Sequence, residues 1–449
     1  MKILLIEPDY KCKYPPLGLM KIATYHRIKG DEVVFFKGRS LDLRAQKWDR
    51  IYISTLFTYY WNETMRTIHY YKNSVCAITD IFVGGIMATL MGDEISKEIP
   101  VTLIRGLLNE SGVLGNDNII VDTLVPDYSI LTQITFRYPT DNAYITYTTR
   151  GCKNKCKFCA VSKLEPDFKH HSDFKHQVLG IKKIYGEKKD LLLLDNNVLA
   201  SSEFERILEE IKDLGFVKGA KLNNRLRFVD FNQGLDARLL TEKKVELLSE
   251  LPLRPMRIAF DNIKMKDLYV EKIKLAAKYG IVHLSNYILY NYNDSPLDLY
   301  RRLKINVLLN EELGTKIYSF PMKFIPLNAK DRSYVSPKWT KKYIRAIQSI
   351  LLATHGMVSP GKTFFEAAFG KNEREFSKIM LMPEAYIINR EKHKLNGGVE
   401  WSGLLNKMNT LEKSKLKLLI RNNKVADDDL LKVKNRKIRM AAQHYLVND

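Results

Sequence analysis

Cysteine is scarce in this chain: only five of its 449 residues are cysteine. So low a count excludes a disulfide-rich secreted scaffold and favours a reducing compartment, so we expect a cytoplasmic protein. No apolar stretch approaches the ~18 to 20 residues that cross a bilayer, and we expect no membrane partner. The sequence also lacks internal repeats, low-complexity tracts and a Walker-type glycine loop.

Three of the five cysteines, Cys152, Cys156 and Cys159, form a C-x3-C-x2-C array. Three thiols in eight positions cannot all pair as disulfides, and thiolates are the soft ligands of iron–sulfur clusters and zinc. A structural zinc site usually needs four protein ligands, and Cys12 and Cys76 lie far away in the sequence. The array therefore predicts a metal centre. It is either a cluster with one iron open to another ligand, or a cluster or zinc ion completed by a distant residue.

The loop at residues 147–161, Y-T-T-R-G-C-K-N-K-C-K-F-C-A-V, resembles that of the radical S-adenosylmethionine (SAM) enzymes. Phe158 stands at the aromatic position before the last cysteine. The resemblance implies a [4Fe-4S] cluster held by the three cysteines, with SAM on the open iron and cleaved reductively to methionine and a deoxyadenosyl radical. It also implies a reductant protein such as flavodoxin or ferredoxin as partner.

The chain is strongly basic, with a formal net charge of +21 and a pI near 9.5. Such an excess attracts polyanions, which favours a nucleic-acid or nucleotide substrate. The other interpretation is an AT-rich genome that has enriched lysine throughout the chain. Charge alone does not separate the two.

The first third of the chain alternates apolar strands with helices. Continuous apolar runs of strand length lie at residues 2–7, 32–37, 50–57, 80–84 and 100–105. Segments of helix length, such as residues 17–29 and 63–72, lie between them. This alternation is typical of a doubly wound parallel sheet, so residues 1–125 are predicted to form a Rossmann-like domain.

The same region resembles the N-terminal domain of cobalamin-binding radical SAM enzymes. The resemblance is carried by Y-P-P-L-G-L at residues 14–19, V-G-G-I-M-A-T at 83–89 and V-P-D-Y at 125–128. It implies a cobalamin-binding-like domain. The D-x-H-x-x-G signature that supplies an axial histidine to cobalt is absent, because no histidine follows Asp9 before His26. Cobalamin binding is therefore left open.

Residues 126–330 continue the alternation, and the resemblance implies that they form a partial (β/α)6 barrel. The strand-like runs are residues 143–149, 190–194, 227–231, 257–260, 282–289 and 316–320. Functional residues of barrels lie at the carboxyl ends of the strands. The cysteine array follows the first of these runs, as the family pattern requires.

Two further strand ends carry polar clusters. Asp195 and Asn196 follow the second run, where the family places the residues that hold the SAM amino group; the alternative is a turn or helix cap. Gln233, Asp236 and Arg238 follow the third run. The arginine fork matches the SAM carboxylate, and carboxylates or amides suit ribose hydroxyls. The alternative for this cluster is capping and an ordinary salt bridge.

Residues 331–449 read as a basic helical region, with a break predicted at residues 426–429. The region either holds a polyanionic substrate or forms a solvated capping bundle. Together the patterns predict a radical SAM enzyme, a transferase that methylates, rearranges or thiolates an unknown substrate. The alternatives are a radical SAM enzyme for a peptide or small metabolite, a zinc- or cluster-stabilised nucleic-acid binder without catalysis, and an electron-transfer subunit.

Overall fold

The computed structural model describes residues 1–170, 174–393 and 397–446. The chain divides into two compact units. The first comprises residues 1–257 and 325–334, and the second comprises residues 258–324 and 335–449. The division falls inside residues 126–330, so the strands of the expected barrel are described in two parts below.

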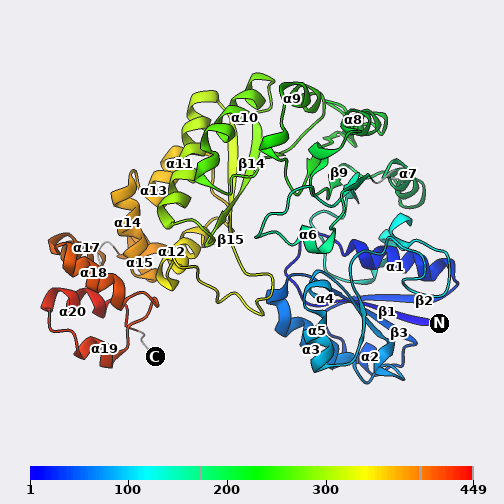
Figure 1. Ribbon diagram of the computed structural model, residues 1–449, viewed down its shortest axis with the longest axis horizontal. Coiled ribbons are helices and arrows are strands. Elements are labelled where there is room, and N and C mark those ends of the chain that lie inside the picture. Colours follow the sequence, from blue (N-terminus) through cyan, green and yellow to red (C-terminus); the bar gives the residue numbers. More distant parts are fainter. Residues whose placement is uncertain (171–173, 394–396, 447–449) are drawn as a thin grey trace. The chain divides into compact units, whose positions relative to one another are not determined.

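The first unit begins with a five-stranded parallel sheet of order β2-β1-β3-β4-β5 (Figure 1). Its strands and helices alternate along the chain: β1 (Lys2–Glu7), α1 (Leu17–Ile28), β2 (Glu32–Lys37), α2 (Leu41–Arg44), β3 (Arg50–Thr55), α3 (Trp61–Tyr71), β4 (Ile81–Gly85), α4 (Ile86–Leu90), α5 (Gly92–Glu98) and β5 (Thr102–Ile104). The predicted Rossmann-like topology is confirmed.

Helices cover both faces of this sheet, with α1 and α3 on opposite sides (Figure 1). Leu4 and Ile6 of β1 pack with Trp61 of α3 in one buried cluster. On the other face, a ring nitrogen of His26 in α1 lies 3.0 Å from the Tyr52 hydroxyl of β3. Successive strand residues point to opposite faces, so apolar residues at every strand position bury both sides of the sheet.

The first unit continues with a three-stranded parallel sheet of order β12-β9-β6. Its strands are β6 (Ala143–Thr146), β9 (Asp190–Leu193) and β12 (Val229–Phe231), close to the predicted runs. Three helices, α7 (Phe174–Tyr185), α8 (Phe204–Asp213) and α9 (Glu242–Ser249), follow or separate them. Shorter elements complete the unit: β7 (Thr149–Arg150), α6 (Val161–Leu164), β8 (Lys169–His170), β10 (Lys221–Leu222), β11 (Arg225–Leu226) and β13 (Met256–Arg257).

The second unit contains a parallel strand pair, β14 (His283–Tyr290) and β15 (Lys316–Lys323), with α10 (Lys266–Lys278) before it and α11 (Pro296–Leu313) between the strands. Ser295 and Asp298 form a capping box at the start of α11, and Gly314 ends the helix in the left-handed conformation. The run predicted as a strand at 257–260 reaches only Arg257, where β13 ends.

Helices form the rest of the second unit: α12 (Lys341–Leu352), α13 (Lys362–Phe369), α14 (Glu373–Leu381), α15 (Glu384–Ile388), α16 (Arg390–His393), α17 (Val399–Lys407), α18 (Thr410–Leu419), α19 (Asp427–Leu431) and α20 (Arg436–Gln443). The helices are interrupted as predicted, but the break lies earlier, between Leu419 and Asp427, where α19 begins. Three aspartates in the first turn of α19 favour a helix start, because their negative charges lie near the positive end of the helix dipole. Among the described residues, no helix is long and apolar enough to span a membrane.

Candidate active site

The three clustered cysteines lie on the loop that leads from β7 to α6, directly after strand β6. None of the three forms a disulfide, and all are partly buried. The backbone N–H of Cys159 donates to the carbonyl of Cys156 (3.0 Å), which forms a turn between the last two. Within the described part of the chain, no three His, Cys, Asp or Glu side chains are already arranged to hold a metal ion. The loop therefore supplies three thiols in sequence but does not hold them in a preformed metal geometry.

The sulfur of Cys152 accepts two hydrogen bonds. The backbone N–H of Asn154 lies 3.4 Å from it, and the side-chain amide nitrogen of Asn197 lies 3.5 Å from it. Asn197 is buried, and its side-chain oxygen has no hydrogen-bond partner among the described residues. Hydrogen bonds to a ligating sulfur stabilise its thiolate form and tune a bound cluster. Asn197 was not among the predicted residues, although it ends the same L-L-L-L-D-N-N run as Asp195.

Asp195 fixes the start of the loop. Its carboxylate is fully buried and accepts hydrogen bonds from the Thr148 N–H (3.0 Å) and from the hydroxyls of Thr148 (2.7 Å) and Thr149 (2.8 Å). Burial raises the pKa of the Asp195 carboxyl, and the hydrogen bonds from the two threonines partly oppose that rise. These contacts assign Asp195 to the backbone before the cysteines, and its contact with SAM stays a prediction.

Glu165 joins the two ends of the cysteine loop. One of its oxygens accepts from the Gly151 N–H (2.6 Å) and from the Asn196 side-chain amide (2.9 Å), and the other pairs with Arg150 (3.0 Å). Gly151 has a φ of +74°, and a Cβ there would lie 2.1 Å from the carbonyl oxygen of Asp167. Only glycine fits this position. We call these contacts of Glu165 the clamp. They bring the predicted residue Asn196 to the root of the loop, where the chain passes from Arg150 to Gly151.

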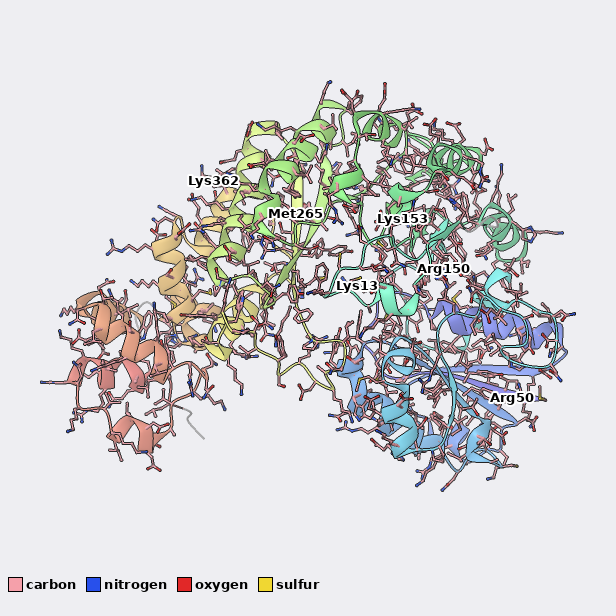
Figure 2. All side chains as sticks on the ribbon, viewed as in Figure 1. Lys13, Arg50, Arg150, Lys153, Met265 and Lys362 are labelled. Carbon is pink, nitrogen blue, oxygen red and sulfur yellow. The ribbon has the colours of Figure 1, made fainter. Side chains whose placement is uncertain are left out.

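A buried charge network lies beneath this clamp. Asp122 pairs with Lys21 (3.3 Å) and Arg150 (3.4 Å), and it accepts a hydrogen bond from the Tyr147 hydroxyl. Burial raises the pKa of Asp122, but Lys21 and Arg150 outweigh it, so the pKa falls below its usual range. Burial lowers the pKa of Lys21 to about 8. The network ties helix α1 to the segment just before the first cysteine; Arg150 and Lys153 are labelled in Figure 2.

The second predicted polar cluster lies beside Cys156. The Asn154 side-chain amide donates to Asp236 (2.8 Å), and Arg238 pairs with the same carboxylate (2.8 Å). Asp236 also caps a short 3-10 turn by accepting from the Arg238 N–H (3.1 Å). The pKa of Arg238 is raised first by Asp236 and also by the neighbouring Cys156 thiol. The capping and the ion pair considered from the sequence are both present, and they place Arg238 next to a cysteine of the array.

The two remaining predicted residues lie close to these groups. Phe158 is half-buried on the cysteine loop. Gln233 is exposed, and its amide donates to the side-chain oxygen of Asn232 (3.3 Å). Asn232, which was not predicted, is buried and donates to the Tyr14 hydroxyl (2.8 Å). This contact links the end of β12 to the Y-P-P-L-G-L segment.

The carboxyl edge of the N-terminal sheet is covered by aromatic rings. The rings of Tyr10 and Tyr60 lie 4.8 Å apart, and the guanidinium of Arg332 lies 4.2 Å from the Tyr59 ring centre. His26 lies in the last turn of α1, near the opposite edge, where it is fully buried and pairs with Asp31 (2.7 Å). It cannot serve as an axial ligand at the carboxyl edge. The residues described here do not supply the imidazole that a cobalamin site of the D-x-H-x-x-G kind requires.

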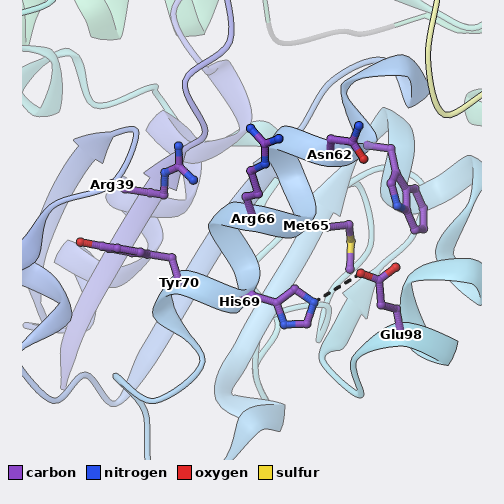
Figure 3. Close-up of a pocket in the computed structure, with 8 residues that line it drawn as sticks. Arg39, Asn62, Met65, Arg66, His69, Tyr70 and Glu98 are labelled. Atoms are coloured by element: carbon purple, nitrogen blue, oxygen red, sulfur yellow. Dashed lines mark hydrogen bonds and ion pairs between the residues drawn. The ribbon is translucent and has the colours of Figure 1, made fainter.

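A separate hollow of about 580 Å³ lies over the exposed side of α3 (Figure 3). Figure 3 shows the ion pair between His69 and Glu98 (3.3 Å) among its lining residues, with Arg39 and Arg66 beside them. None of its lining residues belongs to the predicted site, so its size alone does not make it the candidate site.

The sequence matches no known protein-family model and no curated protein. Solved structures define the class of fold: the chain has the α/β fold of radical SAM enzymes, as predicted. One solved structure with a similar fold is that of TsrM, a radical SAM methyltransferase from Kitasatospora setae solved with a tryptophan substrate and a SAM analogue bound. The match has a TM-score of 0.52 at 12% identity and covers 78% of this chain and 76% of TsrM.

Two weaker matches have TM-scores below 0.5. The cobalamin-dependent enzyme OxsB matches with a TM-score of 0.43 at 13% identity, over 68% of this chain and 51% of OxsB. SuiB from Streptococcus suis, solved with SAM bound, matches with a TM-score of 0.34 at 12% identity, over 47% of each chain. This chain thus spans about half the length of either protein.

Proposed function

We propose that the chain is a radical SAM enzyme that cleaves SAM reductively and then methylates, rearranges or thiolates its substrate. The observation that carries the proposal is the position of the C-x3-C-x2-C loop, directly after the first strand of a three-stranded parallel sheet. The likeness of the fold to TsrM supports it. No step is assigned to cobalamin.

Cys152, Cys156 and Cys159 are the proposed cluster ligands. A [4Fe-4S] cluster bound there would supply the electron that splits SAM into methionine and a deoxyadenosyl radical. Gly151 and the clamp at Glu165 hold the loop's base, and Asn197 donates to the Cys152 sulfur.

Arg238 and Asp236 are the proposed SAM contacts. Arg238 is half exposed, so its guanidinium can pair with the SAM carboxylate, while Asp236 is partly covered and held by Asn154. Gln233 and Asn196 supply exposed or half-exposed amides for further hydrogen bonds. With Phe158 they are the remaining groups that we propose to contact the nucleoside and amino-acid parts of SAM.

The proposed substrate is a nucleic acid or a nucleotide. The lysines of the cysteine loop support this class, since Lys153, Lys155, Lys157 and Lys163 are all exposed. Fixed cations around a site attract polyanions and raise their local concentration. A peptide or small metabolite remains the second substrate class, without a structural feature in its favour.

Anaerobic reconstitution with iron and sulfide, followed by an assay for deoxyadenosine, tests the proposal. A chemical reductant replaces the flavodoxin or ferredoxin expected in the cell. The wild type should form deoxyadenosine from SAM, and Cys156→Ala should lose this activity together with cluster absorbance. Cys76→Ala is the matched control, because Cys76 is an exposed free thiol outside the array and its loss should change neither.

Other results of this assay point to the rival classes. Iron that binds without deoxyadenosine formation would leave an electron-transfer subunit or a cluster-stabilised binding protein. Zinc that binds in preference to iron would contradict the proposal. In either case metal binding would still need the three cysteines. The formation of deoxyadenosine, and not metal binding, therefore separates the enzyme from the rival classes.

A further inference from the structure

The last part of the second unit, residues 399–446, forms a helical module with its own core. Helices α17, α18 and α19 each contact α20. Their buried side chains form one cluster that includes Trp401, Leu405, Leu416, Ile438 and Tyr445. This core holds the outer faces of the helices in fixed positions. We call residues 399–446 the C-terminal module.

The C-terminal module carries a large excess of positive charge. It has eleven lysines and arginines and only five aspartates and glutamates. Ten of the eleven cationic side chains are exposed. The cations are Lys407, Lys413, Lys415, Lys417, Arg421, Lys424, Lys432, Lys434, Arg436, Lys437 and Arg439.

Most of these cations have no acidic partner. In the described part of the module, only Lys432 and Lys437 lie within 4 Å of a carboxylate, each at 3.7 Å. Helix α8 in the first unit differs: Arg206 pairs with Glu210 (2.6 Å), and Lys212 pairs with Glu209 (2.9 Å). A general enrichment of lysine accounts for the number of cations but not for nine unpaired ones in a single module. Unpaired cations repel one another, so a polyanion that binds them relieves that repulsion.

The densest part of this charge lies at residues 432–439, K-V-K-N-R-K-I-R, which has five cations and no carboxylate. Asn435 caps α20 by accepting from the Ile438 N–H (3.1 Å), which sets the helix that follows. Ile438 faces the core, while Arg436 and Arg439 are exposed. Residues three apart on a helix are neighbours on its surface, so these two arginines form one outward pair beside Lys434.

We propose that this cationic surface, centred on Lys434, Arg436 and Arg439, binds the phosphate backbone of a nucleic acid. The apolar residues of α20 face the core, so the helix lacks the apolar face by which a helix lies on a membrane. The aromatic residues of the C-terminal module are also buried, since Trp401 and Tyr445 lie in its core. Without exposed rings to stack on bases, binding depends on phosphates and is independent of sequence.

The binding itself does not depend on SAM chemistry. The further role of this surface, to dock the substrate of the enzyme, rests on the proposed function. Wild-type protein that binds nucleic acid but forms no deoxyadenosine would contradict the proposed function and leave the binding surface standing. Deoxyadenosine formation without nucleic-acid binding would do the reverse.

Fluorescence anisotropy of the full chain with short labelled single-stranded and duplex RNA and DNA tests the surface. The variant combines Lys434→Gln, Arg436→Gln and Arg439→Gln. It should bind at least about tenfold more weakly at low salt. The slope of log affinity against log salt should shrink by about 3, roughly one for each phosphate that the variant no longer neutralises. Circular dichroism confirms that the variant is folded.

The matched control combines Lys274→Gln, Arg301→Gln and Lys362→Gln; Lys362 is labelled in Figure 2. It removes the same charge from the same unit, but each of these cations is paired with a glutamate, at 2.7, 2.7 and 3.1 Å. The control should keep nearly wild-type affinity. Equal losses in both variants, or no binding by the wild type, would overturn the proposal. Binding to phosphatidylserine vesicles in place of RNA and DNA would assign the surface to membranes and also overturn it.

Discussion

The root of the cysteine loop and the C-terminal module use charge in opposite ways. At the root, Lys21, Asp122 and Arg150 are buried or nearly so, and the carboxylate lies between the two cations. In the C-terminal module, cations are exposed and mostly unpaired. Buried charges must be paired to be tolerated, whereas exposed ones need no partner. The first arrangement therefore positions a loop, and the second leaves its charges free for a ligand.

The largest effect is expected from Asp122→Asn. The substitution keeps the shape of the side chain but leaves Lys21 and Arg150 without their shared carboxylate. Breaking a buried ion pair by removing one partner typically costs about 3–5 kcal/mol of unfolding free energy. Urea denaturation followed by tryptophan fluorescence measures the loss, and bound iron after reconstitution should fall with it.

The control for this change is Asp93→Asn, which removes a carboxylate from an exposed ion pair with Arg105 in the same unit. Exposed ion pairs are screened by water and contribute little to stability, so the control should be close to wild type. Similar losses in the two variants would show that burial does not separate the two kinds of charge, and the comparison would fail.

Lys342 tests the same rule with an unpaired charge, because it is buried and its amine has no hydrogen-bond partner in the part of the chain that the structure describes. Burial lowers the pKa of Lys342 to about 7. Lys342→Met keeps the volume and removes the charge, so we expect the variant to be more stable by about 3 kcal/mol at neutral pH. Urea denaturation of both proteins measures the gain.

The gain should depend on pH in a defined direction. The folded-state pKa lies near 7 and that of the unfolded chain near 10.5, so the unfolded state binds the proton more tightly between them. Wild-type stability should therefore rise with pH across this window and level off below it. The advantage of Lys342→Met should be full below pH 7 and vanish toward pH 10. A constant difference would mean that Lys342 stays charged or finds a partner.

Much of the fold was predictable because its signals are local. The apolar runs at residues 2–7 and 32–37 became β1 and β2 with the same bounds, and the strand-like run at 143–149 before the cysteine loop contains β6. The break predicted at 426–429 lies earlier, between Leu419 and Asp427, and the three aspartates form the first turn of α19, where acidic residues are favourable.

The site was less predictable because its contacts join distant segments. Asp195 lies 47 residues from Thr148, and Glu165 lies 31 residues from Asn196, so no window of sequence shows either contact. The family resemblance led us to predict that Asp195 contacts SAM, and this stays a prediction; the hydrogen bonds that its carboxylate accepts from Thr148 were not predicted. Asp122 carried no signal at all, since a lone aspartate in a linker gives no hint of the two buried cations that it neutralises.

The smallest effect is expected where the C-terminal module loses its own charges. The variant with Lys434→Gln, Arg436→Gln and Arg439→Gln removes exposed cations that have no acidic partner, so its unfolding free energy should change by no more than about 0.5 kcal/mol. The change should be toward greater stability, because like charges repel. Urea denaturation at low and high salt checks this, and the difference between variant and wild type should shrink as salt screens the repulsion. A loss above about 1 kcal/mol would mean that these cations support the module's fold, and the contrast with the root of the cysteine loop would disappear.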